Sequence, residues 1–341
     1  MRTNARPRMF DTVLTPFALI VLSLLMSALS VRASDVTRTW IEWQVDANAL
    51  MGAGNYEAAT KSLRNALDAV QAHGSPQHQA IVYNSLGSAY TQTGQYVEAE
   101  ANFRCALEIE KRRLGAGSLE YALIFASIAL LPTHAANREQ AIEVLKTAIA
   151  RYKGKVSPTG ITIAQDYLIK LLCSGARFVE AEEVLYDWQD MFANGNAQPD
   201  PSMQAELLND EGVLQDELGN KEQALKLDQE AISTLEAALG TEHPSLVVPL
   251  NNLATIYAKL NRYDDSQRVF LRADAICIKT LGENHPARAT LLANYAVVLR
   301  KMGHKKESKK INAEAQQIAQ SSNRRNGVGS TISVSALRAS R

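Results

Sequence analysis

Aromatic residues are scarce in this chain, at 6% of 341 residues, although apolar residues make up 46%. Most of the apolar side chains are Ala and Leu, and runs of β-branched residues are rare. Alanine and leucine favour helices, whereas strands are enriched in aromatic and β-branched residues. The composition therefore predicts packed helices rather than sheets.

Neither sign of charge dominates, since 36 Lys and Arg residues balance 36 Asp and Glu residues. A balanced chain lacks the strongly basic surface that binds nucleic acid, so we expect no nucleic-acid partner. The three cysteines, Cys105, Cys173 and Cys277, fall in separate predicted helices. We interpret them as buried thiols that act as small hydrophobic residues, not as partners in a disulfide.

The motifs of common active sites are also missing from the sequence. It has no glycine-rich phosphate loop after a strand, no HExxH and no nucleophile elbow. His243 and His285 recur at equivalent places, but no cysteine or further histidine stands at ligand spacing from either. A helix-capping role explains them better, so we predict no catalysis, no cofactor and no metal site.

The N-terminal segment has the pattern of an export signal. Three arginines within the first eight residues precede an apolar run from about residue 13 to 29. Val31 and Ala33 then place small residues where a signal peptidase cleaves, which predicts a signal peptide over residues 1–33 and a periplasmic or secreted product. The alternative is an uncleaved membrane anchor, because residues 12–31 are about long enough to cross a bilayer.

A repeat of 40 to 43 residues occupies most of the remaining sequence. Its register is marked by a small residue in the second helix of each unit: Ala59, Ala99, Ala141, Ala181, Ala224, Ser266 and Ser308. Seven residues later each unit has an alanine, except that the fourth has Trp188. Small residues two helical turns apart let neighbouring helices approach closely, so the sequence predicts seven helical hairpins.

The boundaries of the units carry helix stop and start signals. The segment LGTEHP at residues 239–244 recurs as LGENHP at residues 281–286. Glycine ends a helix without strain, and proline is tolerated at the first position of the next. Pro132 predicts an early end for a helix in the third unit, and Asp228 replaces the large apolar residue that other units have, such as Phe270.

The segments LGxxHP and LNNLA, the latter at residues 250–254, resemble the tetratricopeptide repeat in the longer form found in kinesin light chains. Tyr257, which follows LNNLA, belongs to the same pattern. The resemblance implies an all-α fold, a right-handed superhelical solenoid of about seven hairpins whose first helices line a concave face. We expect this array to span residues 36–320, followed by a disordered basic tail over 321–341.

The resemblance also implies that the concave groove binds a protein or peptide. Family members grip a peptide backbone with asparagines of the first helices, because a primary amide both donates and accepts hydrogen bonds. The matching positions in this chain are Asn84, Asn209, Asn251, Asn252 and Asn294. The alternative is that these amides bridge neighbouring repeats.

One turn further along the same face lie Gln92, Glu217, Lys259 and Lys301, with Arg300 beside the last, so the charge changes sign along the groove. The C-terminal end of the groove is therefore predicted to be basic and to receive an acidic peptide or a C-terminal carboxylate. The alternative is a solvated end cap. Together these features predict an exported, non-catalytic scaffold or, if the N-terminal segment is retained, a membrane-anchored assembly factor of an envelope complex.

Overall fold

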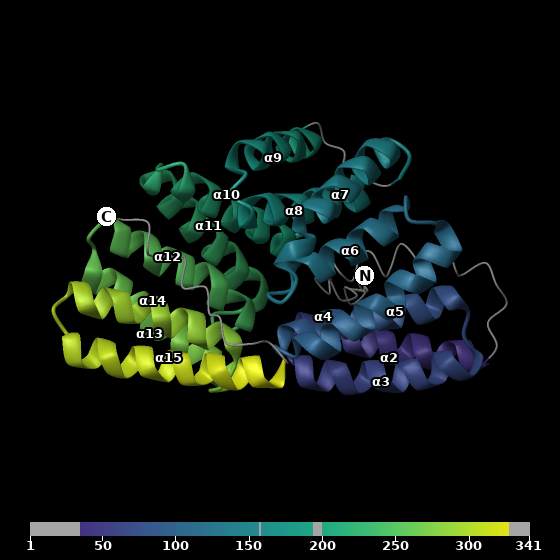
Figure 1. Ribbon diagram of the computed structural model, residues 1–341, viewed down its shortest axis with the longest axis horizontal. Helices are drawn as coiled ribbons and strands as arrows, with labels where there is room; N and C mark the ends of the chain where they lie inside the picture. The colour runs from purple at the N-terminus through teal and green to yellow at the C-terminus, as the bar shows by residue number, and fades with distance from the viewer. Residues whose placement is uncertain (1–34, 157, 194–199, 327–341) are drawn as a thin grey trace, which may run out of the picture.

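The computed structural model describes residues 35–156, 158–193 and 200–326, and within these ranges it contains α-helices and no strand. The predicted export signal lies outside the described residues. Fourteen helices of the described part, α2 to α15, pair into seven hairpins arranged as a ring (Figure 1). Their bounds are α2 Asp35–Gly52, α3 Tyr56–His73, α4 Pro76–Gln92, α5 Tyr96–Leu114, α6 Leu119–Leu130, α7 Arg138–Tyr152, α8 Pro158–Ser174, α9 Phe178–Ala193, α10 Pro201–Glu217, α11 Lys221–Leu239, α12 Val247–Lys259, α13 Tyr263–Leu281, α14 Pro286–Lys301 and α15 Lys305–Arg325, with 3₁₀ turns at η1 Ala135–Asn137 and η2 Pro244–Leu246.

Each hairpin is closed by the small residues that mark the repeat. All seven register residues are buried, as are the seven residues that follow them by two turns. Ser266 and Ser308 stand where other units have alanine, and their hydroxyls donate to the carbonyls of Ala254 and Ala296, both at 2.6 Å. These acceptors belong to the first helix of the same hairpin, so the serines fit without leaving a polar group unsatisfied. The predicted all-α solenoid of seven hairpins is confirmed.

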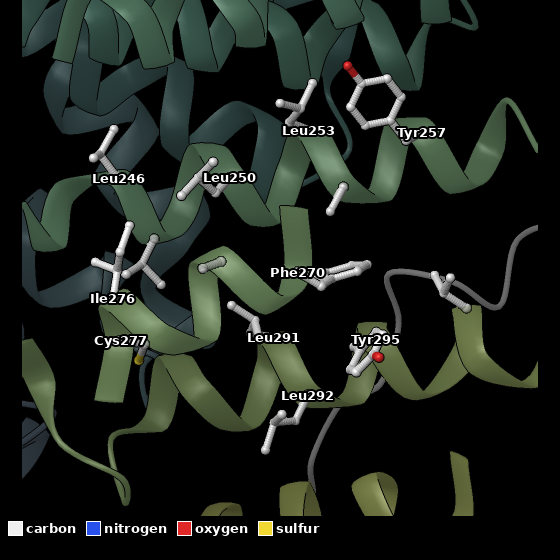
Figure 2. Close-up of a cluster of buried hydrophobic side chains, with 14 of the residues drawn as sticks. Leu246, Leu250, Leu253, Tyr257, Phe270, Ile276, Cys277, Leu291, Leu292 and Tyr295 are labelled. Atoms are coloured by element: carbon white, nitrogen blue, oxygen red, sulfur yellow. The ribbon is translucent and has the colours of Figure 1, made fainter. Parts of the chain in front are cut away.

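The core runs continuously between neighbouring hairpins. Figure 2 shows its C-terminal part, where Phe270 of α13 lies between Leu250 of α12 and the side chains of Leu291 and Tyr295 of α14. Phe270 is fully buried, and its ring stands 5.7 Å from that of Tyr295. Burial of one such side chain stabilises the fold by about 1.5–3 kcal/mol. Each hairpin therefore depends on its neighbours for much of its stability.

The stop signals act as the sequence predicts. Gly240 and Gly282 end α11 and α13 with φ of 90° and 94° and ψ near 160°, a combination that essentially only glycine adopts. Helix α6 ends at Leu130, two residues before Pro132, which confirms the early end expected from that proline.

One burial and one boundary differ from the sequence-based expectation. Cys105 is exposed, so its interpretation as a buried thiol was wrong, whereas Cys277 is buried and Cys173 is partly buried. Helix α15 runs to Arg325 and Asn326 is only 6% exposed, so the disordered tail does not begin at residue 321. The buried face of α15 continues through Ile318 and Ser322 at helical spacing, and the polar composition of this segment concealed it. Residues 327–341 lie outside the described part.

The two ends of the solenoid meet. Asn326 follows the last helix and lies against the first turn of α5, 230 residues earlier in the chain. Its side-chain oxygen accepts hydrogen bonds from the backbone N–H groups of Tyr96, at 2.7 Å, and Val97, at 3.3 Å, and its amide donates to the Gly94 carbonyl at 3.1 Å. The residue that precedes α5, Gln95, makes no capping bond of its own with its side chain. Asn326 therefore supplies the N-cap of α5 from the opposite end of the protein.

Two histidines close the ring in the same way. Nδ1 of His243 accepts a hydrogen bond from the Ser245 backbone N–H at 3.2 Å, and Nε2 lies 3.1 Å from the Gly52 carbonyl at the end of α2. His285 repeats this arrangement one unit later, with Ala287 at 3.2 Å and the Gln92 carbonyl at the end of α4 at 2.9 Å. Because Nδ1 accepts, the proton must be on Nε2, which donates to the carbonyl. The capping role predicted for both histidines is confirmed, and each imidazole also joins two distant helix ends.

Close backbone packing completes this contact, which we call the seam: residues 52–56 and 92–97 against residues 240–246, 285–287 and 326. Gly54 and Gly94 have φ of 72° and 71°, and a Cβ on either would lie within 2.6 Å of Pro244 or Pro286. Both the backbone conformation and the available space therefore require glycine at these two turns. The contact therefore occurs twice. The turn at Gly54 packs against the loop at Pro244, and the equivalent turn at Gly94, one repeat later, packs against the loop at Pro286.

A buried acid interrupts the core in the fifth hairpin. Asp228 occupies the place that Phe270 has in the sixth hairpin, and it is completely inaccessible to solvent. Neither carboxylate oxygen has a hydrogen-bond partner among the described residues, and a Cβ on Gly212 would lie 2.5 Å from Oδ1. Burial, together with the nearby Asp216 carboxylate, raises the pKa of Asp228 to about 8. Asp228 is therefore protonated at neutral pH.

We predict that Asp228→Asn stabilises the protein, and does so increasingly as the pH rises. The unfolded chain has the ordinary aspartate pKa of 3.8, so between pH 4 and about 8 the folded state holds a proton that the unfolded state releases. Stability then declines with rising pH by up to about 1.4 kcal/mol per pH unit from this group alone. Urea unfolding at pH 5, 6.5 and 8 measures the effect. Asp264→Asn, at an exposed position on α13, is the control, and equal gains in both variants would contradict the prediction.

We predict that Asn326→Ala loosens the seam. Loss of an N-cap costs about 0.5–2 kcal/mol, and here the same side chain also holds the two ends of the solenoid together. The variant should unfold at lower urea concentration and have a larger radius of gyration in small-angle X-ray scattering. Asn312→Ala, at an exposed position on α15, is the matched control. An unchanged radius would show that the histidines hold the seam without Asn326.

Candidate functional site

Closure of the ring converts the concave face into a partly enclosed cavity of about 490 Å³. Its wall consists mainly of first helices, from α4, α6, α8, α10 and α12, and the seam residues Tyr56, His243 and Ser245 close one side. We call this cavity the lumen. The apolar part of its lining comprises Met51, Phe103, Leu130, Ile163, Met203, Ala205, Leu235, Leu239, Val248 and Pro249.

Charged side chains gather on the wall formed by α8 and α10. Asp166 and Lys170 lie one turn apart on α8, and Glu206 and Asp210 lie one turn apart on α10, so each pair projects from one side of its helix. Lys170 Nζ donates to Asp166 Oδ2 at 2.9 Å and to Glu206 Oε2 at 3.1 Å. We call these four residues the acidic cluster. Three carboxyl groups surround a single ammonium group.

The electrostatics of the cluster follow from its depth inside the ring. Burial raises the pKa of Asp210 to about 8, although Lys170 acts in the opposite direction. Burial also raises the pKa of Asp166. Burial alone would lower the pKa of Lys170, but the surrounding carboxylates outweigh it and keep the ammonium charged. Glu206 has a side chain 49% exposed, so the cluster faces the open volume of the lumen.

The predicted asparagines bond to one another across the repeats. Asn252 of α12 donates to Oδ1 of Asn209 of α10 at 3.0 Å, and Asn294 of α14 donates to Oδ1 of Asn251 at 3.0 Å. A longer contact of 3.5 Å links Asn251 to Asn252 and joins the two pairs. These are the bridges between repeats that the sequence left open as an alternative. Asn84, on α4, is half-buried.

The other predicted residues separate into two groups. Gln92 lines the lumen, as does Asn209. Lys259 forms an ion pair with Asp216 of the preceding repeat, which neutralises one of the cations expected at the basic end of the groove. Arg300 and Lys301 are exposed at the end of α14 and do not appear in the lumen lining.

Sequence reasoning missed the acidic cluster. Ile163, Asp166, Tyr167 and Lys170 recur at steps of three and four on α8, a signal that places them together on the inner face. The third and fourth units have diverged from the repeat pattern, so the family pattern predicts no binding residue on α8. Helix α8 faces the seam only because the ring closes. No local sequence pattern predicts that closure.

The described part of the chain contains neither a membrane span nor a metal site. No helix in it is both long and apolar enough to cross a membrane. Within the same residues, no group of three or more histidine, cysteine, aspartate or glutamate side chains is placed to hold a metal ion.

The chain belongs to the tetratricopeptide repeat family. The family model matches residues 47–112, 78–154, 204–273 and 246–321, which together make up more than half of the chain. A model of anaphase-promoting complex subunit 5 matches residues 165–238. This shorter match covers α8 to α11, the segment that carries the acidic cluster.

Among known proteins, the chain is similar to Protein KINESIN LIGHT CHAIN-RELATED 3 of Arabidopsis thaliana, with 25% identity over 227 residues. The match covers 64% of this chain and 34% of that relative, so the chain spans about a third of it. A solved Rap protein, complexed with Competence and Sporulation Factor, has a TM-score of 0.61 at 12% identity and covers 90% of this chain and 94% of that one. BtubC (BKLC) from P. vanneervenii has a TM-score of 0.51 at 20% identity over 70% and 94% of the two chains. These structures establish the repeat fold.

Proposed function

We propose that this protein binds a peptide, or an extended segment of a partner protein, inside the lumen and catalyses no reaction. The observation that carries the proposal is the lumen itself: a cavity of about 490 Å³ lies within the range of ligand sites. It is lined by apolar side chains with a few polar groups between them, the usual composition of such sites. The solved Rap protein of similar fold was determined with a bound factor, which agrees with this choice.

Val248 supports binding inside the ring. It stands on α12, lines the lumen and is 56% exposed, although it is a large apolar side chain. An apolar side chain exposed inside a concave cavity gains stabilisation when a ligand covers it, by about 25 cal/mol for each Å² removed from water. No such gain is available from the folded chain alone.

The polar contacts of the ligand are part of the same proposal. Gln92 and Asn209 line the lumen, and we propose that their amides bond a peptide backbone there. We propose that Asn84, Asn251, Asn252 and Asn294 extend this set along the first helices. Lys259, Arg300 and Lys301 would engage a ligand only where it extends beyond the lumen, and Lys259 would have to exchange Asp216 for the new partner.

We predict that Val248→Trp blocks the lumen. Indole is much larger than isopropyl, so the substituted side chain should occupy the space that a ligand needs, while the exposed position spares the core. Capture of peptides from a tryptic digest of the host's exported proteins measures binding. We expect at least tenfold less captured peptide than with the unmodified protein. Val179→Trp, on α9 with the valine 66% exposed and outside the lumen lining, is the matched control.

Equal capture by both tryptophan variants would place binding outside the lumen. Capture of nothing by the unmodified protein would contradict the proposed function.

We further propose that the protein is exported, on the evidence of the basic and apolar pattern of residues 1–33. Expressed in its own host, the exported protein should begin at Ser34 when its N-terminus is sequenced. An N-terminus that retains residues 12–31, with extraction only by detergent, would instead establish the membrane-anchored alternative. Recovery of the whole protein from the cytoplasm would contradict both.

A further inference from the structure

The inner wall of the lumen carries three carboxyl groups and one ammonium group. In the acidic cluster Asp166, Glu206 and Asp210 share one lysine, whose two hydrogen bonds in the cluster go to Asp166 and Glu206. Asp210 receives a long bond of 3.4 Å from the Asn209 amide, and its carboxyl group also shares a hydrogen bond with that of Asp166. Lys170 therefore makes no hydrogen bond to Asp210.

Two polar atoms on the same wall lack partners among the described residues. Asp210 Oδ2 is inaccessible to solvent and accepts no hydrogen bond. Ser202 lines the lumen from the same face of α10, is 5% exposed, and its hydroxyl has no partner either. Buried polar groups in folded proteins are almost always hydrogen-bonded, so two atoms without partners on one cavity wall have capacity left for a polar group that approaches from the cavity.

The remaining lining indicates what carries that polar group. Leu130, which is only partly buried, adds apolar surface beside the polar wall, and Tyr167 adds an aromatic face beside Lys170. A bare metal ion or a free inorganic cation would leave this surface uncovered. A basic side chain has an apolar stem as well as a charged end, so it matches both parts of the wall.

We propose that the ligand of the lumen is a peptide with a lysine or arginine side chain, which donates to Asp210 and Asp166 while its apolar parts cover Leu130 and Tyr167. This inference rests on the proposed function and defines the class of peptide. It differs from the acidic ligand predicted from Lys259, Arg300 and Lys301, because the ionisable groups of the acidic cluster are three carboxyl groups and one amine. A positive ligand would also draw Asp210 into its ionised form, so binding would release a proton.

The test is selection from a library of random decapeptides displayed on phage, with the full chain as bait. Three further baits are used: Asp166→Asn/Asp210→Asn, which removes two carboxylates from the lumen; Lys170→Gln, which removes its cation; and Glu222→Gln/Asp264→Asn, which removes two exposed carboxylates from the outer helices. Circular dichroism establishes that each bait is folded. The readout is the frequency of Lys and Arg in the recovered peptides relative to the starting library.

We expect Lys and Arg to be enriched at least threefold by the unmodified protein and by the outer-helix control. The enrichment should disappear with Asp166→Asn/Asp210→Asn and should increase with Lys170→Gln, because that variant removes the ammonium group that competes with a basic ligand for these carboxyl groups. Opposite effects from two variants of one cluster cannot arise from a general loss of folding.

The outcomes separate the two proposals. Peptides recovered without enrichment in basic residues, or with enrichment in Asp and Glu, would overturn the inference and leave peptide binding intact. Enrichment that persists in Asp166→Asn/Asp210→Asn would also overturn it, since the charge would then be recognised elsewhere. Recovery of no peptide by any bait would overturn both proposals.

Discussion

The imidazole of His285 joins two helix ends that lie 193 residues apart, and the ring depends on this contact and its counterpart at His243. Each imidazole satisfies an N–H at the start of one helix and a carbonyl at the end of another, which are the groups a helix leaves unpaired. Each of these histidines thus caps a helix and also closes the ring. Without closure the first helices would line an open groove with solvent on one side.

Closure changes what polar groups on the inner face can do. In an open groove, water screens charges and completes the hydrogen bonds of side-chain amides. Inside the ring, protein surrounds these groups, and they satisfy one another across neighbouring repeats. Asn252 bonds Asn209, Lys259 pairs with Asp216, and Lys170 serves two acids. The amides that sequence matching assigns to a ligand therefore already have partners in the free protein, and a ligand must compete for them or use their remaining capacity.

Local features of this fold were predictable because they are repeated. The register residues, the glycine stops and the proline starts each recur, and recurrence separates a structural signal from chance. The periodicity of α8 places Asp166 on its inner face. It does not predict a cavity there, because the opposite wall of the lumen comes from segments more than seventy residues away. Asn326 illustrates the limit most clearly. In the sequence it sits among serines and arginines that are typical of disorder, and only its contact with α5 gives it a buried, structural role.

Two acids in this protein have their pKa raised to about 8, and their surroundings give them different consequences. Asp228 is sealed between helices against Gly212, where a ligand has no access, so its unsatisfied carboxyl only reduces stability. Asp210 has a similarly raised pKa but faces a cavity, so the same energetic deficit can be relieved by a molecule that enters. A buried acid is thus evidence for a binding site only where open volume adjoins it. The lumen meets that condition and the core of the fifth hairpin does not, which is why the charge of the ligand is inferred from α8 and α10 alone.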